Sequence, residues 1–160
     1  MTDEEEALKW CKMVAEVGNG YAQWRLGKAY EKGELGQEID LQLALMWYRK
    51  AAEGGEGCAQ RRLAEACEFG KFGLKIDVHV ALDWYRKAAI GGHAGAQWRL
   101  GKACKFGDKL TLPIDLEEAF KWYRMAADSD HAGAQGRLGE AYEDGDLGRA
   151  IDLLVALMWF

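Results

Sequence analysis

Side chains capable of covalent or metal chemistry are few in this 160-residue chain and lie far apart. The three histidines, His79, His93 and His131, lack the H-E-x-x-H spacing by which a helix presents two ligands to zinc. Ser129, the only serine, lies in an Asp-Ser-Asp turn and is not a candidate nucleophile. The glycine-rich joints carry no phosphate-binding pattern. We therefore predict no catalytic residue, no metal site, no cofactor and no enzymatic activity.

The four cysteines fit core positions better than a redox or metal site. They form no C-x-x-C pair, and two of them share one helix about nine residues apart, which is too far for a disulfide. Three occupy positions that tyrosines fill elsewhere in the chain. We expect reduced thiols at Cys11, Cys58, Cys67 and Cys104. The location stays unknown, with the cytoplasm favoured.

A repeated hexapeptide organises the rest of the chain. Trp-Tyr-Arg-Lys-Ala-Ala occurs at 47–52 and 84–89, and a close copy occurs at 122–127. Successive tryptophans lie 37, 37, 38 and 37 residues apart, at Trp10, Trp47, Trp84, Trp122 and Trp159. A constant period of this length indicates a tandem array rather than one central core.

Two further signatures keep the same period. Ala-Gln-x-Arg-Leu begins at residues 22, 59, 96 and 134, and Ile-Asp recurs at 39–40, 76–77, 114–115 and 151–152. The extra residue of the third repeat lies in the loop between Gly107 and Asp115. We divide the chain into a half repeat at 3–18, repeats at about 21–55, 57–92 and 93–130, and a truncated repeat at 131–160.

Each repeat is predicted to be a helical hairpin. The first helix buries Ala22, Leu26, Ala29 and Tyr30 and stops at Gly33. The second helix starts at an aspartate N-cap, Asp40, Asp77, Asp115 or Asp152, and Ile39 closes over the first cap. Its predicted buried residues are Leu41, Ala44, Leu45, Tyr48, Ala51 and Ala52. In the third repeat, Glu118 has the spacing of a reciprocal capping box with Asp115, and Pro113 lies in the loop. The opening half repeat is expected to bury Ala7, Leu8, Cys11, Val14 and Ala15.

Charge and hydropathy exclude two classes of partner. The formal net charge of −5 argues against nucleic-acid binding, which needs a concentrated basic surface. No apolar run reaches the roughly 18 residues needed to cross a bilayer, so no membrane insertion is expected. The acidic start, Asp-Glu-Glu-Glu at 3–6, is unlike a secretory signal.

The repeat pattern resembles the Sel1-like repeat family, relatives of the tetratricopeptide repeats. The first repeat carries the family pattern at Leu26, Gly27, Tyr30, Gly33, Asp40, Ala44, Trp47, Tyr48, Ala51 and Ala52. Ala64, Cys67 and Cys104 depart from it by small-residue or core exchanges. The resemblance implies an all-α fold, an α-solenoid built as a right-handed superhelix of antiparallel helix hairpins of 37–38 residues. It also implies a noncatalytic scaffold that binds a protein or peptide.

In related superhelices the outward side of the first helix lines a concave groove. The residues expected there are Trp24, Arg25, Lys28, Arg61, Arg62, Trp98, Arg99 and Lys102, which we predict as the partner-binding site. Glu31 points the same way, as do its equivalents Glu68, Lys105 and Glu143. Exposed aromatics beside arginine are typical of interface hot spots. In the alternative interpretation, Trp24 and Trp98 lie under loops or against the next repeat.

The arginine of every repeat also has two interpretations. Arg25, Arg62, Arg99 and Arg137 recur at the border of the buried sector. A structural role, stacking on the next repeat or pairing with a carboxylate of the second helix, is favoured because every repeat keeps the residue. The alternative is a ladder of donors for a bound peptide. The five periodic tryptophans are expected to be core.

Both ends of the chain divide a repeat. Residues 153–160 would leave apolar side chains uncovered, from which we expect a fragment of a longer array or self-association through uncapped ends. Two alternatives to a binding scaffold remain open: a rigid spacer in a longer multidomain protein, and a hydrolase that uses groove carboxylates.

Overall fold

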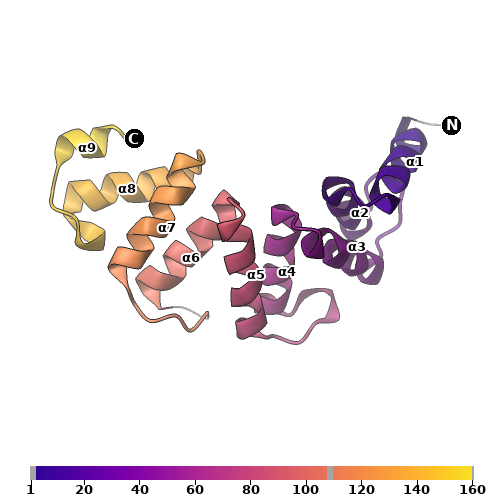
Figure 1. Cartoon of the computed structure of the whole chain (residues 1–160), viewed down its shortest axis with the longest axis horizontal. Coiled ribbons are helices and arrows are strands. Elements are labelled where there is room, and N and C mark those ends of the chain that lie inside the picture. Colours follow the sequence, from indigo (N-terminus) through magenta and orange to yellow (C-terminus); the bar gives the residue numbers. More distant parts are fainter. Residues whose placement is uncertain (1–2, 108–109, 160) are drawn as a thin grey trace. The chain divides into compact units, whose positions relative to one another are not determined.

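The computed structural model describes residues 3–107 and 110–159. In this part of the chain the secondary structure is helical and contains no strand, as predicted. The chain divides into two compact units, unit 1 at Met1–Asp77 and unit 2 at Val78–Phe160. Within each unit, every helix packs against the next helix in sequence (Figure 1). This packing of consecutive helix hairpins is that of an α-solenoid.

The helices follow the predicted repeat closely. Unit 1 contains α1 (Asp3–Glu16), α2 (Gly20–Lys32), α3 (Leu41–Glu53), α4 (Gly57–Phe69) and the 3-10 turn η1 (Lys71–Gly73). Unit 2 contains α5 (Val78–Ile90), α6 (Ala94–Phe106), α7 (Leu116–Asp128), α8 (Ala132–Asp144), η2 (Asp146–Gly148) and α9 (Leu153–Leu157). None of the described helices is long and apolar enough to cross a membrane.

The core of each hairpin is built from small residues facing a tyrosine. Tyr48 of α3 lies against Gly27 of α2, where an added Cβ would come within 2.7 Å of the ring. Tyr123 of α7 lies in the same way against Gly101 of α6, at 2.9 Å. Glycine at these positions lets the two helices of a hairpin approach closely. The predicted alanines and Leu26 are buried with them.

Two hydrogen bonds fix the loop between the helices of a hairpin. The aspartate before the second helix accepts from first-turn amides, as predicted for Asp40, Asp115 and Asp152. Its own N–H donates to a carbonyl near the end of the first helix, for example from Asp40 to Tyr30 at 2.9 Å and from Asp152 to Tyr142 at 2.7 Å. The predicted reciprocal capping box is wrong, because the Asp115 N–H donates to the Cys104 carbonyl and not to Glu118.

The loop after the first helix carries an apolar residue, which at η1 and η2 packs against that helix and against the second helix of the preceding repeat. Leu35, Phe72 and Leu147 follow the first helix by two residues beyond its glycine, and all three adopt the left-handed conformation, with φ of 58°, 56° and 53°. Phe72, Leu147 and the corresponding Leu110 are buried. The sequence pattern did not predict these core residues.

The next loop residue is also left-handed, and three repeats place glycine there. Gly36, Gly73 and Gly148 have φ of 68°, 75° and 68°. The third repeat places Thr111 at this position with φ of 56°. A β-branched residue is strained in this conformation, at a cost of roughly 1–2 kcal/mol.

A glutamine, buried at positions 23, 60 and 97 and half-buried at 135, joins each hairpin to the helix before it. The side-chain Nε2 of Gln23 donates to the Ala15 carbonyl at 3.0 Å, and that of Gln60 donates to the Ala52 carbonyl at 3.1 Å. Gln97 and Gln135 repeat the bond to Ala89 and Ala127. These carbonyls lie in the last turn of a helix, where the backbone has no helical donor. The glutamine therefore satisfies a polar group that packing removes from water.

Several predicted core residues are less buried than expected. In α1 only Ala15 is buried, whereas Ala7 and Val14 are exposed, and Leu41 of α3 is exposed too. The prediction of core tryptophans is wrong for Trp10, which is 56% exposed. The other periodic tryptophans are half-buried, and lysines cover two of them, with Lys50 Nζ 4.7 Å from the Trp47 ring centre.

Cysteine burial is uneven. Cys104 is buried, whereas Cys11, Cys58 and Cys67 are half-buried, and all four are free thiols. Burial raises the pKa of both Cys58 and Cys67 above that of an ordinary thiol. At the end of unit 2, apolar side chains are exposed as expected, among them Leu153, Leu157 and Met158. Association through this surface stays a prediction.

Candidate functional site

The predicted groove residues lie on the first helix of successive repeats. In unit 1, α2 carries Trp24, Arg25 and Lys28, all half-buried, and α4 carries Arg61 and Arg62. In unit 2, α6 carries Trp98, Arg99 and Lys102, also half-buried. Each unit therefore has its own aromatic and basic surface.

The two groove tryptophans have different surroundings. Trp24 lies 5.4 Å from the exposed ring of Tyr21, measured between ring centres. Trp98 stacks on His131, with ring centres 5.4 Å apart and planes 23° apart, and Lys102 Nζ lies 4.8 Å from the indole centre. One face of Trp98 is thus covered by the start of α8, while Lys102 lies over the ring.

Helix α8 has glycine at two positions that follow His131, namely Gly133 and Gly136. An added Cβ at Gly133 would lie 3.3 Å from the indole nitrogen of Trp98. One turn further, Gly136 has open space around it and takes the repeat position of Trp24, Arg61 and Trp98. The indole nitrogen itself is buried with no hydrogen-bond partner in the described residues.

His131 has a structural role that the sequence pattern did not predict. Its Nδ1 accepts from the Ala134 N–H at 3.2 Å, and His93 Nδ1 accepts from Ala96 in the same way. Both histidines are helix N-caps, at the position where Asn19 and Glu56 cap α2 and α4. Among the described residues, no cluster of histidine, cysteine and acidic side chains is suited to hold a metal ion.

Arg62 belongs to a cluster of paired charges in unit 1. Its Nε donates to Glu31 Oε2 at 3.1 Å, Nη2 also bonds Glu31, and Nη1 donates to Glu65 at 2.8 Å. The Tyr48 hydroxyl donates to Glu31 Oε2 at 2.7 Å. Arg62 also lies 5.3 Å from the centre of the Phe72 ring. The arginine therefore pairs with carboxylates of the first helices, α2 and α4, and contacts the neighbouring repeat through Glu31. The alternative of a bond to a second-helix carboxylate is wrong for Arg62.

The cluster keeps Glu31 ionised. Burial alone would raise the pKa of Glu31, but the hydrogen bonds from Arg62 and Tyr48 and the charge of Arg62 outweigh it and lower that pKa. Burial and the adjacent carboxylate raise the pKa of Tyr48, so its hydroxyl remains a donor. Glu31 was expected to face a groove. It instead links α2, α3 and α4, and its equivalent Glu68 is buried.

The same repeat positions hold different groups in unit 2. Lys105 replaces the glutamate, Tyr123 is the tyrosine and Arg137 is the arginine. Lys105 pairs with Asp146 of η2, and Arg137 Nη1 donates to Glu140 at 2.6 Å. The Tyr123 hydroxyl is buried and has no partner in the described part of the chain. Burial raises the pKa of Tyr123 to about 12, so the hydroxyl carries its proton at neutral pH.

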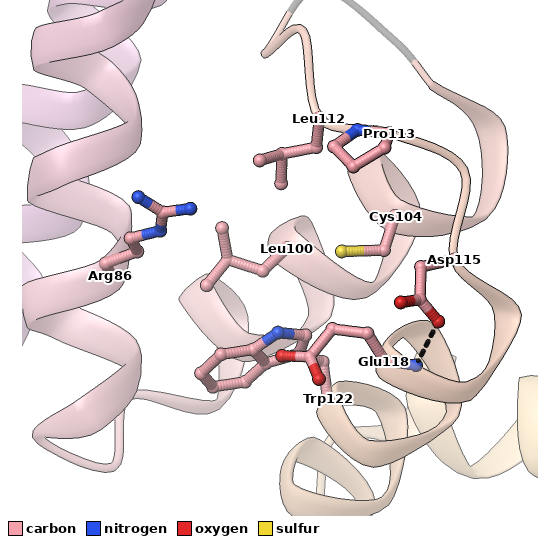
Figure 2. Close-up of a pocket in the computed structure, with 8 residues that line it drawn as sticks. All are labelled: Arg86, Leu100, Cys104, Leu112, Pro113, Asp115, Glu118 and Trp122. Carbon is pink, nitrogen blue, oxygen red and sulfur yellow. Dashed lines mark hydrogen bonds between the residues drawn. The ribbon is translucent and has the colours of Figure 1, made fainter.

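Unit 2 also contains a pocket of about 190 Å³ between α5, α6, α7 and the loop before α7. Figure 2 shows the Cys104 sulfur directed toward the pocket, with Arg86 entering from the α5 side. The lining residues are Arg86, Leu100, Cys104, Leu112, Pro113, Asp115, Glu118 and Trp122. Asp115 is already used as the cap of α7, at 2.9 Å from the Glu118 nitrogen. The longer third loop was the only sequence signal for this pocket.

Comparison with known proteins agrees with the repeat pattern. The family model described as Sel1 repeat matches residues 2–19, 20–56, 59–93, 94–131 and 132–160. No match is found among curated proteins.

Solved structures give the same result. A Sel1 repeat protein from Oxalobacter formigenes is 34% identical, with a TM-score of 0.85, over 97% of this chain and 62% of that one. The protective antigen c5321 of uropathogenic Escherichia coli, which displays an SLR fold, is 36% identical, with a TM-score of 0.80, over 95% of this chain and 32% of that one. This chain thus spans less than two thirds of either protein.

A more distant structure shares the fold alone. The immunity protein Pa5087 from Pseudomonas aeruginosa is 21% identical, with a TM-score of 0.65, over 99% of this chain and 57% of that one. Repeats of this type typically mediate protein interaction. From its repeat pattern, its hairpin packing and these matches, the chain belongs to the Sel1 repeat family.

Proposed function

We propose that this chain is a noncatalytic scaffold that binds a protein or peptide on the outward side of its first helices. In unit 2 the binding surface consists of Trp98, Lys102, Gly133 and Gly136, which we call the Trp98 surface. In unit 1 the corresponding residues are Trp24, Lys28 and Arg61.

The observation that supports this proposal is the half-buried indole of Trp98 beside a helix that has glycine at positions 133 and 136. Its ring lies under Lys102 and against His131, so the indole is held in one orientation. A fixed aromatic ring loses little conformational entropy on binding. The open space at Gly136 then gives a partner's apolar side chain room to pack beside it.

The binding test compares matched tryptophan variants. Wild type, the Trp24→Ala/Trp98→Ala double variant and Trp10→Ala serve as baits in extracts of the source cells, with captured proteins quantified by mass spectrometry. Trp10 is an exposed tryptophan outside the predicted surface and is therefore the control. We expect wild type and Trp10→Ala to capture the same partner and the double variant to lose it.

Helical circular dichroism of all three proteins must stay the same for the comparison to count. Calorimetry with the purified partner then gives the affinity, which should fall at least tenfold in the double variant, as is typical of a lost hot spot. Undiminished capture by the double variant would exclude this surface. Absence of any partner would favour the rigid spacer.

A further inference from the structure

Units 1 and 2 share a set of hydrogen-bond donors, but only unit 1 supplies the acceptor. In unit 1 the Glu31 carboxylate receives the Tyr48 hydroxyl and two nitrogens of Arg62. Together these donors surround one carboxylate between three helices. Glu31 therefore shows which chemical group the arrangement of tyrosine and arginine accepts.

Unit 2 keeps the donors and loses the carboxylate. Tyr123 and Arg137 occupy the positions of Tyr48 and Arg62, but Lys105 stands where Glu31 would be. The Tyr123 hydroxyl is left buried with no partner among the described residues. Burial of a hydroxyl without a hydrogen bond is unfavourable, so the Tyr123 hydroxyl indicates a missing acceptor.

The two cations at the repeat positions of Glu31 and Arg62, Lys105 and Arg137, are each paired with a carboxylate. Arg137 pairs with Glu140 one turn along the same helix, and the two side chains are 41% and 46% exposed. Lys105 is 11% exposed and pairs with Asp146, which is 37% exposed. The Arg137–Glu140 pair is open to water and therefore weak, so Glu140 can turn into solvent while Arg137 binds another anion. Lys105 is nearly buried, and its partner Asp146 also accepts from the Leu147 N–H at 2.8 Å, so this second pair is firmer.

We propose that Tyr123, Arg137 and Lys105 form a site for one carboxylate of a protein partner, from an aspartate or glutamate side chain. This site rests on the proposed function, because Lys102 and Lys105 lie one turn apart on α6 and Arg137 follows Gly136. A partner on the Trp98 surface therefore reaches the carboxylate site with a neighbouring acidic residue.

The charge of the site favours a monoanion. Two cations, Lys105 and Arg137, face two resident carboxylates, Asp146 and Glu140, so the site has no excess positive charge. A phosphate dianion would add two negative charges beside these carboxylates, whereas one carboxylate adds only one. In unit 1 Arg62 binds two carboxylates at once, Glu31 and Glu65. The Glu31 carboxylate of unit 1 shows the arrangement that we expect for a bound carboxylate in unit 2.

The test uses two peptides with blocked ends, tetraglutamate amide and tetraglutamine amide, in titrations of the full chain monitored by NMR. We expect tetraglutamate to bind in the millimolar range or tighter and tetraglutamine not to bind. Tyr123→Phe should weaken tetraglutamate about tenfold, which corresponds to one hydrogen bond to a charged group. Lys121→Gln, which removes an exposed cation of α7, should keep the affinity within about twofold.

A second variant places a carboxylate of the chain itself in the site. Lys105→Glu together with Asp146→Lys copies the arrangement at Glu31 and Lys71 of unit 1. We expect this double variant to unfold at a higher temperature and to lose tetraglutamate binding. Equal binding of the two peptides, or unchanged affinity in Tyr123→Phe, would overturn the carboxylate site, as would tighter binding of inorganic phosphate.

The outcome is separable from that of the proposed function. Trp98→Ala should leave tetraglutamate affinity within about twofold, because the carboxylate is bound by Tyr123, Arg137 and Lys105. Loss of partner capture in the tryptophan double variant tests the Trp98 surface. Loss of the acidic peptide in Tyr123→Phe tests the carboxylate site.

Discussion

Removal of the same hydroxyl at two equivalent repeat positions should have opposite effects on stability. Tyr48→Phe and Tyr123→Phe delete one oxygen atom each, and both rings are buried against a glycine of the preceding helix. The Tyr48 hydroxyl donates to Glu31 at 2.7 Å, whereas the Tyr123 hydroxyl has no partner among the described residues. The pair therefore isolates the hydrogen bond from the packing of the ring.

The magnitudes follow from the type of bond. A hydrogen bond to a charged group contributes about 1.5–3 kcal/mol, and Glu31 retains Arg62 when Tyr48 is changed, so Tyr48→Phe should cost about 1.5–2 kcal/mol. Tyr123→Phe removes a hydroxyl that loses its hydration on folding and gains no hydrogen bond within the described residues. It should leave the free energy of unfolding unchanged or raise it by up to about 1 kcal/mol.

Thermal unfolding followed by circular dichroism at 222 nm measures both variants. For a chain of this length each kcal/mol shifts the midpoint by about 2–4 °C, so Tyr48→Phe should lower it by roughly 3–8 °C. Urea unfolding gives the free energies directly, with slopes equal to wild type. Equal losses in the two variants would refute the reasoning, because they would show that the Tyr123 hydroxyl has an acceptor or that the Tyr48 bond contributes nothing.

Further predictions concern the loops, the glutamine bonds, acid stability and the thiols. Thr111→Gly should raise the free energy of unfolding by about 0.5–1 kcal/mol, because relief of the positive φ outweighs the greater conformational entropy of the unfolded chain. The reciprocal Gly148→Thr should lower the free energy of unfolding by about 1–2 kcal/mol. Urea titrations measure both. Gln60→Leu should cost about 1–2 kcal/mol because it leaves the Ala52 carbonyl buried and unpaired, while Gln135→Leu, whose bond is 3.4 Å long and half-buried, should cost less. The folded-state pKa of Glu31 lies below its ordinary 4.5, so its contribution is complete above pH 4.5 and is lost as the pH falls through the lower folded value. Glu31→Gln should therefore flatten the fall in stability below pH 4.5, and an unchanged slope would contradict the paired carboxylate. Four thiols should react in the unfolded, unreduced protein, and Cys104 should react slowest in the native one because it is the most buried.

The repeat period predicts most of the fold because a residue pattern that recurs in several repeats is not a chance local match. Leu26, Tyr48 and Asp40 recur with their neighbours in several repeats, and each obeys a local rule of helix face or cap. The helices accordingly begin and end close to the predicted residues.

The structural features that the sequence did not predict depend on contacts between residues that are distant in the sequence. Gln23 and its equivalents recur in every repeat, but a polar residue at a buried position makes sense only once the carbonyl of the preceding helix is known. Leu35, Phe72 and Leu147 adopt a conformation usually assigned to glycine, so turn rules do not predict them. The half-burial of Trp47 and Trp98 reflects covering side chains, Lys50 and His131, that a helical wheel does not contain.

The side-chain bonding around the candidate site could not be predicted from the sequence. A helical wheel places Trp98 and Lys102 outside the buried sector, and both are half-buried, but their role in binding stays a prediction. The wheel could not show that Arg62 and Arg137 both bond the glutamate three residues later, whereas only Arg62 also bonds Glu31, whose repeat position is lysine at 105. The function of the lysine at this position remains a proposal.

The bond that closes each interhelical loop has a practical use in protein engineering. Asp115 N still reaches the Cys104 carbonyl at 2.9 Å although its loop is one residue longer than the others. One additional loop residue is therefore accommodated without loss of this hydrogen bond. A foreign epitope or affinity tag grafted between Gly107 and Leu110 should leave the neighbouring hairpin in register.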